Sequence, residues 1–229
     1  MLVKFKLNKN LDKKIILEFL NAKAGGIDFG SNLIKLHPFL KVIKNKSIKE
    51  KKKFISKFVD SFYKTNNLKP RLKQIEEAWK KVEDSYFEEI KKLFKIKGKK
   101  YTAYFSIINT CPRWITKREF TISYYFPIKG NIEVICHELT HFFFYEYVSK
   151  HFAKKLTANQ KWHLSEIFNL IILNQKQFAK LYAPIKEPGY PAHKKYIKQY
   201  KRLFDNFKDL KSFLNKAIKL TKKIKFSKP

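Results

Sequence analysis

Residues 137–141 read His-Glu-Leu-Thr-His, which is the H-E-x-x-H pattern. On a helix, the two histidines of this pattern lie on one face, about one turn apart. Both imidazoles can then bind a single Zn²⁺, and Glu138 lies beside them, near a water that the metal activates. Zinc lowers the pKa of that water to near 7, so the carboxylate can take its proton and pass it to a leaving amine. The pattern predicts a zinc-dependent hydrolase, with His137 and His141 as ligands and Glu138 as the general base.

A catalytic zinc needs a third protein ligand and an open fourth position. His163 and Glu166 lie three residues apart on the next expected helix, so they share a face and both are candidates. We favour Glu166, because two histidines and a carboxylate form a known catalytic set and because an unpaired carboxylate among apolar neighbours is costly. His151 would lie roughly 15 Å further along the first helix, out of reach of the ion.

These residues resemble the zincin metallopeptidases, and among them the gluzincins. That thermolysin-like group carries H-E-x-x-H on one helix and a Glu ligand on a later one. The resemblance covers about residues 120–173. It implies that His137, His141 and Glu166 bind zinc and that Glu138 is the general base of a peptidase.

The chain also departs from that family pattern. Gluzincins usually have an Asp four residues after the ligand Glu, where it supports a zinc-bound His, whereas Leu170 stands there and Asn169 is the nearest substitute. The metzincin pattern is excluded, because Phe144 and Tyr147 replace its Gly and its third His. Residues 120–126 correspond to the strand that lines the family's cleft, and a peptide could add beside it as an extra strand.

Peptide hydrolysis also needs a donor for the oxyanion that develops on the scissile carbonyl. The family uses a Tyr or a His for this. Downstream of Glu166, residues 187–193 offer Tyr190 and His193 on a chain stiffened by prolines at positions 184, 188 and 191. We predict that one of these two side chains is the donor. The alternative is a plain interhelical turn.

The elements that must position these residues follow from hydrophobic periodicity. Short alternation predicts strands at 3–7, 101–108 and 120–126, with a turn at Cys111-Pro112 between the last two. Helical spacing predicts helices at 11–22, 48–63, 70–94, 132–150, 158–181 and within 194–224, with caps at Ser47, Asn131 and Thr157 and a loop through Gly30 and Pro38. Helices 48–63 and 70–94 are expected to pack as a hairpin. The fold class is therefore α+β and helix-rich, with a helical N-terminal region and a small sheet ahead of the active-site helix and the third-ligand helix.

Positive charge gathers at the two ends of the chain. Lys and Arg number 51 against 19 Asp and Glu, a net charge of +32, and the excess is +16 over residues 1–100 and +13 over 176–229 but only +3 over 101–175. We therefore divide the chain into a basic helical N-terminal region (1–97), a zincin-like core (98–183) and a basic helical C-terminal region (184–229). Such flanks suit nucleic acid or another polyanion. Only four of the 51 cations are Arg, however, and lysine-rich codon use on a solvated surface is the simpler explanation.

Composition excludes several classes of protein. At 229 residues and 44% hydrophobic, the chain can bury a core. It has no apolar stretch long enough to span a bilayer, no signal-peptide pattern and only two cysteines, so we expect a cytoplasmic protein without a membrane partner. A zinc peptidase acting on a peptide or protein is the leading interpretation. The alternatives are a basic polyanion-binding protein with a structural or degenerate metal site, and an enzyme activated by removal of about residues 1–95.

Overall fold

The computed structural model describes residues 2–181, 189–207 and 209–226. The fold is α+β, with many helices and a small mixed sheet that precedes the two helices carrying the predicted ligands, as the sequence predicts. The residues group into two compact units. The first unit consists of residues 1–24, 28–81 and 100–135, and the second of residues 25–27, 82–99 and 136–229. The division of the sequence at positions 98 and 184 stays a prediction.

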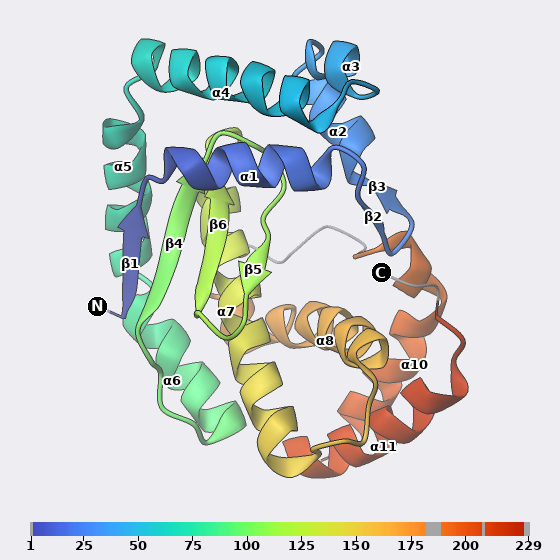
Figure 1. The fold of residues 1–229 in the computed structure, drawn as a ribbon. Coiled ribbons are helices and arrows are strands. Elements are labelled where there is room, and N and C mark those ends of the chain that lie inside the picture. Colours follow the sequence, from blue (N-terminus) through green and yellow to red (C-terminus); the bar gives the residue numbers. More distant parts are fainter. Residues whose placement is uncertain (1, 182–188, 208, 227–229) are drawn as a thin grey trace. The chain divides into compact units, whose positions relative to one another are not determined.

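A four-stranded sheet forms the centre of the first unit (Figure 1). Its strands are β1 (Val3–Lys6), β4 (Tyr101–Ser106), β6 (Glu119–Ser123) and β5 (Arg113–Trp114), in that spatial order. β1 and β6 run parallel to β4, and β5 runs antiparallel to β6. The three predicted strands are confirmed with shorter bounds, and β5 falls within the predicted turn. A separate two-stranded hairpin joins β2 (Lys23–Ala24) to β3 (Ile27–Asp28).

Besides this sheet, the first unit contains helices. They are α1 (Lys9–Phe19), α2 (Phe29–Leu36), α3 (Leu40–Ile43), α4 (Ile48–Thr65) and α5 (Leu68–Lys80). α4 begins at the predicted capping box, in which Ser47 Oγ accepts from the Glu50 N–H and the Glu50 carboxylate accepts from the Ser47 N–H. α4 packs along α1, and Lys13 Nζ lies 2.9 Å from Asp60 Oδ1 between them. The predicted hairpin of α4 with the following helix is therefore wrong.

Two other boundaries differ from the prediction. Residues 70–94 form not one helix but α5 and α6 (Glu83–Phe94), separated at residues 81–82. The buried residues Ile75, Trp79, Tyr86 and Ile90 continue nearly in phase across this break, so periodicity alone does not show it. The predicted loop through Gly30 and Pro38 contains α2 and α3 instead.

Asn131 was predicted to cap a helix but lies inside α7 (Ile128–His151), so that prediction is wrong. Its side chain binds the end of β6: Oδ1 accepts from the Ser123 N–H at 2.8 Å, and Nδ2 donates to the Ser123 carbonyl at 2.9 Å. The Thr121 N–H donates to the Pro112 carbonyl at 3.0 Å. β4 pairs with one edge of β6. On the other edge, β5 and these hydrogen bonds use the backbone groups of β6 that an added strand would need. The predicted addition of a peptide strand beside residues 120–126 is therefore wrong.

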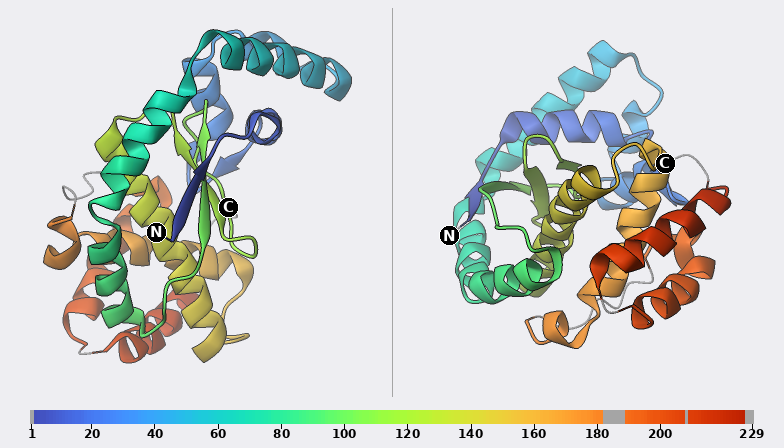
Figure 2. Two further views of the ribbon diagram at one scale, coloured as in Figure 1. Left: turned by 90° about the vertical axis from the view of Figure 1, so that its left-hand side faces the viewer. Right: turned by 90° about the horizontal axis from the view of Figure 1, so that it is seen from below.

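The second unit is helical. It holds α6, the later part of α7, α8 (Ala158–Leu173), α9 (Lys176–Ala179), α10 (Lys194–Asp205), α11 (Leu210–Lys223) and a 3-10 turn at Pro191–His193. α8 begins at the predicted capping box of Thr157 and Gln160. It ends at Leu173 and not near 181. α8 contacts both α10 and α11, and Figure 2 shows the three helices together.

A buried carboxyl group in the first unit gives a testable pH dependence. Asp12 on α1 is 2% exposed, and it accepts hydrogen bonds from Ser106 Oγ and, at 2.7 Å, from the Tyr63 hydroxyl. Burial raises the pKa of Asp12 from 3.8 to about 6. Between pH 4 and 6 the folded chain therefore binds a proton that the unfolded chain releases, and the free energy of unfolding falls as the pH rises through this window.

Replacing Asp12 with Asn should remove this pH-dependent loss. Relative to the wild type, D12N should gain up to about 3 kcal/mol in the free energy of unfolding between pH 4 and pH 7, since each pKa unit corresponds to about 1.4 kcal/mol. Urea unfolding at both pH values measures the difference. D60N is the control on the neighbouring helix: contacts with Lys13 and Lys9 lower the pKa of Asp60 to about 2, so this carboxyl titrates below pH 4 and the effect of D60N should be nearly the same at pH 4 and pH 7. A D12N effect that is the same at both pH values would contradict the account.

Candidate metal centre

The two histidines of the motif lie one turn apart on α7, in the second unit. Their Nε2 atoms are 3.0 Å apart and their ring centroids 4.7 Å apart. Tyr86 of α6 contacts this turn of the helix: its hydroxyl lies 2.8 Å from Thr140 Oγ1 and 3.1 Å from the Cys136 carbonyl. Tyr86 therefore fixes the turn that holds His137 and His141. Sequence reasoning missed this role, because a Tyr on an apolar helix face looks like any other core residue.

α8 brings Glu166 to the same point. Its Oε2 lies 3.3 Å from the Nε2 of His137 and 3.3 Å from the Nε2 of His141. The side chains of Glu166 and His141 are 2% and 0% exposed, whereas that of His137 is 31% exposed. The three ligand atoms thus form a small triangle that is buried on two sides and reaches solvent at His137.

This triangle fits a metal ion. A tetrahedral zinc with bonds of about 2.0–2.1 Å holds its ligand atoms about 3.3 Å apart, close to the spacing between these three atoms. Two imidazole nitrogens and a carboxylate oxygen are also a donor set typical of zinc. Each ligand atom belongs to the second unit, and all three lie within 4.8 Å of one another. His137, His141 and Glu166 therefore form a site that could hold a metal ion.

Asn169 joins α8 to α7 beside this site. Its Nδ2 donates to the His137 carbonyl at 2.7 Å, and its Oδ1 is buried without a hydrogen-bond partner among the residues that the structure describes. From the sequence, Asn169 was the nearest substitute for an Asp that supports a zinc-bound His. It does hold a predicted ligand in place, but through the backbone carbonyl and not through the ring.

His163, the alternative third ligand, lies elsewhere. Its Nδ1 is 2.7 Å from the Nε2 of His193, both residues are buried, and the ring of Phe226 stacks on the His163 ring at 4.1 Å and 14°. Burial and the neighbouring His163 lower the pKa of His193 to about 4, although Glu166 acts in the opposite direction. His193 is therefore neutral at pH 7. This pair explains why His163, one turn before Glu166, does not join the triangle.

Tyr190 lies in the same aromatic cluster. Its ring centroid is 5.0 Å from that of Trp162 and 5.6 Å from that of His193. Gly25 packs directly against it: a Cβ there would lie 2.5 Å from Tyr190 Cδ1, and the Gly25 carbonyl accepts from the Ala192 N–H at 3.1 Å. Gly25, in the turn between β2 and β3, therefore leaves room for the ring of Tyr190. Residues 184, 187 and 188 of the predicted turn lie outside the described residues.

Glu138, His151 and Cys136 also lie on α7. Glu138 follows His137 on α7 and is buried. His151 ends that helix with its ring 4.4 Å from Tyr147, outside the triangle, as its distance along the helix predicts. Cys136 is fully buried, as expected of a small apolar residue.

In comparisons with known proteins, no family model, curated protein or solved structure matches this chain. Within the described part of the chain, no helix combines the length and the apolar character that crossing a membrane requires.

Proposed function

We propose that this protein is a zinc-dependent peptidase of the gluzincin type. One observation carries the proposal: the ligand atoms of His137, His141 and Glu166 lie 3.0–3.3 Å apart, and the residue after the first histidine is a glutamate. A structural zinc site closes all four positions with protein ligands, whereas a catalytic site keeps one open. Three ligands, one of them partly exposed to solvent, favour the catalytic kind.

In this proposal, different residues of the chain bind the metal and transfer the proton. His137, His141 and Glu166 hold the ion, and a bound Zn²⁺ supplies Lewis-acid chemistry, polarising the scissile carbonyl and lowering the pKa of water in the site. Glu138 takes a proton from the attacking water and donates it to the leaving amine. The contacts of Tyr86 with the same helical turn keep Glu138 in register with the ligands.

Tyr190 is our preferred oxyanion donor. The Nε2 of His193 faces the Nδ1 of His163 at 2.7 Å, whereas the phenol of Tyr190 is a hydrogen-bond donor of the kind that stabilises an oxyanion. Removing one oxyanion donor typically costs a factor of 10² to 10³ in kcat.

Replacing Tyr190 with Phe should therefore lower kcat about a hundredfold or more and leave the metal content unchanged, because the ring that packs on Trp162 stays. Replacing His193 with Asn is the comparison and should affect thermal stability more than kcat, because it disturbs a buried pair. Steady-state kinetics and elemental analysis of both variants decide the assignment. Unchanged kcat in Y190F would remove Tyr190 from the mechanism.

The activity itself is tested with a peptide library read by mass spectrometry. The wild-type protein should cleave members of the library, lose this activity with a zinc chelator and regain it when Zn²⁺ is restored. No cleavage by the zinc-loaded protein would contradict the proposal.

The net charge of +32 favours a second function, a protein that binds nucleic acid or another polyanion around a structural metal site. Its signature is an affinity for DNA that falls steeply with salt concentration. The two functions separate in one comparison, because Glu138→Gln should abolish cleavage and leave polyanion binding intact.

A further inference from the structure

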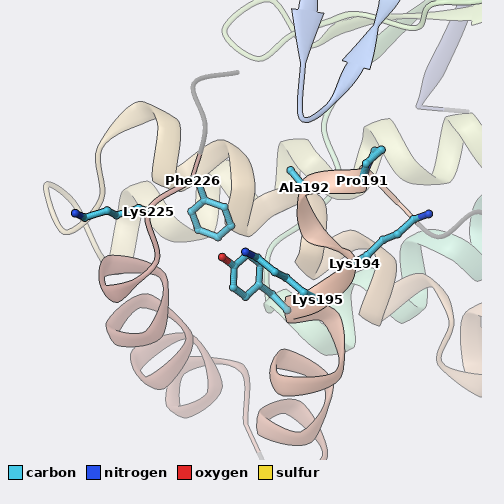
Figure 3. Close-up of a pocket in the computed structure, with 7 residues that line it drawn as sticks. Pro191, Ala192, Lys194, Lys195, Lys225 and Phe226 are labelled. Atoms are coloured by element: carbon cyan, nitrogen blue, oxygen red, sulfur yellow. The ribbon is translucent and has the colours of Figure 1, made fainter.

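A cavity of about 410 Å³ opens in the second unit (Figure 3). Its lining comes from the 3-10 turn, the first residues of α10 and the chain that follows α11. The lining includes Lys194, Lys195, Lys225 and Phe226. A volume of this size suits a small ligand or a short peptide segment.

The charge of this cavity has one sign. Three of its seven lining residues are lysines and none is acidic. Within the part of the chain that the structure describes, no ion pair joins Lys194, Lys195 or Lys225 to a carboxylate, whereas Lys13, Lys92 and other surface lysines do have acidic partners. A second cavity, of about 420 Å³, contains Asp209 beside its lysines and has no such uniform charge. The first cavity therefore suits an anionic ligand with a small apolar part that can lie on Phe226.

The cavity is linked to the candidate metal centre through one ring. Phe226 stacks on His163 at 4.1 Å, and Glu166 lies one helical turn after His163. With about 5–6 Å between side chains three apart on a helix, the lining ring and the metal ligand are on the order of 10 Å apart. An extended peptide covers this distance in about three residues. Pro191 and Ala192 of the lining also lie between Tyr190 and His193 in the sequence.

We propose that this cavity binds the carboxylates of an acidic peptide, so that the enzyme selects substrates with Asp or Glu a few residues from the scissile bond. The selectivity rests on the peptidase function proposed above; the binding site rests on the cavity alone. Its lining supplies three compact ammonium charges and no acidic residue, and these charges attract the carboxylates of a peptide. A hollow that seven residues line also fits a short peptide segment better than a long nucleic acid backbone, which needs an extended groove.

The test measures binding without turnover, in full-length Glu138→Gln protein as purified. The probe is a fluorescein-labelled heptapeptide with three Glu residues, compared by anisotropy at 0.15 M salt with the same peptide carrying Gln. The cavity variant is K194Q/K195Q/K225Q. The matched control is K198Q/K201Q/K222Q, which removes the same charge from exposed positions on α10 and α11, outside the lining. We expect the cavity variant to lose at least tenfold in affinity for the Glu peptide and the control to stay within twofold of the parent.

Three results would overturn the proposal. Equal losses in the two triple variants would mean that the peptide senses only overall charge. Equal affinities for the Glu and Gln peptides would exclude carboxylate recognition. A cavity variant that loses affinity for a single-stranded oligonucleotide but not for the Glu peptide would assign the cavity to nucleic acid. The test measures peptide binding and not cleavage, so it can confirm the binding site even if the protein has no peptidase activity. The failure of one proposal is therefore distinguished from the failure of the other.

Discussion

Glu138→Gln should lower the turnover of a cleavable peptide by two to four orders of magnitude, the usual contribution of a general acid–base group. Gln has the size of Glu but cannot take a proton from water. The change leaves His137, His141 and Glu166 in place, so the metal content should stay that of the wild type. Loss of turnover without loss of metal separates a catalytic carboxylate from a structural one.

The matched control for this variant is Glu146→Gln on the same helix. Glu146 lies five residues after His141, where its carboxylate accepts from Lys99 Nζ at 2.7 Å. The pair is partly exposed and contributes little to stability, so E146Q should keep turnover within about twofold. Steady-state kinetics on one peptide compare the two variants. An E138Q protein that retains more than a tenth of wild-type turnover would remove Glu138 from the mechanism.

Removing the metal should also destabilise the second unit. The ligands come from α7 and α8, so an ion that binds only the folded chain stabilises it by about 4 kcal/mol when the free metal concentration is 1,000 times Kd. Without the ion, the carboxylate of Glu166 remains 2% exposed between two imidazoles, an environment that favours a compensating charge. A chelator should therefore lower the wild-type Tm by several degrees, and Zn²⁺ should restore it.

Glu166→Gln provides the control, because it keeps the side-chain volume and removes the charged ligand. Its Tm should respond little to either chelator or Zn²⁺ in the same thermal scans. If the wild-type Tm is equally insensitive, the triangle of ligand atoms is held by hydrogen bonds alone, and no ion joins α7 to α8.

The sequence predicts the triangle well because its geometry is mostly local. The i, i+4 spacing places His137 and His141 on one face wherever that segment is helical, and the capping box at Thr157 fixes the start of α8. The sequence favours Glu166 over His163 on the chemistry of the ligand set, but it does not show where His163 lies. His163 is held by His193, 30 residues away, and by the ring of Phe226, and no pattern in the sequence encodes those contacts.

The incorrect boundaries have a common physical origin. Asn is favoured at helix caps and also where its side chain can bond to the backbone of another segment. Asn131 takes the second role, because its side chain bonds to Ser123 of β6 and does not cap α7. The apolar face of α4 packs on α1. Helix periodicity shows which face of a helix is apolar, but it does not show which other helix that face contacts. The alternation of residues in β6 also does not show which of its backbone groups are free. In the structure, the loop before β5 and the side chain of Asn131 on α7 bind backbone groups of β6.

Elemental analysis of the purified protein tests the metal centre most directly, with the wild type, Glu166→Ala and His163→Ala measured side by side. The account predicts about one zinc per chain in the wild type and in H163A, and its loss in E166A. A wild-type protein that holds no metal and takes up none when zinc is added would contradict it, as would an E166A protein that keeps its zinc.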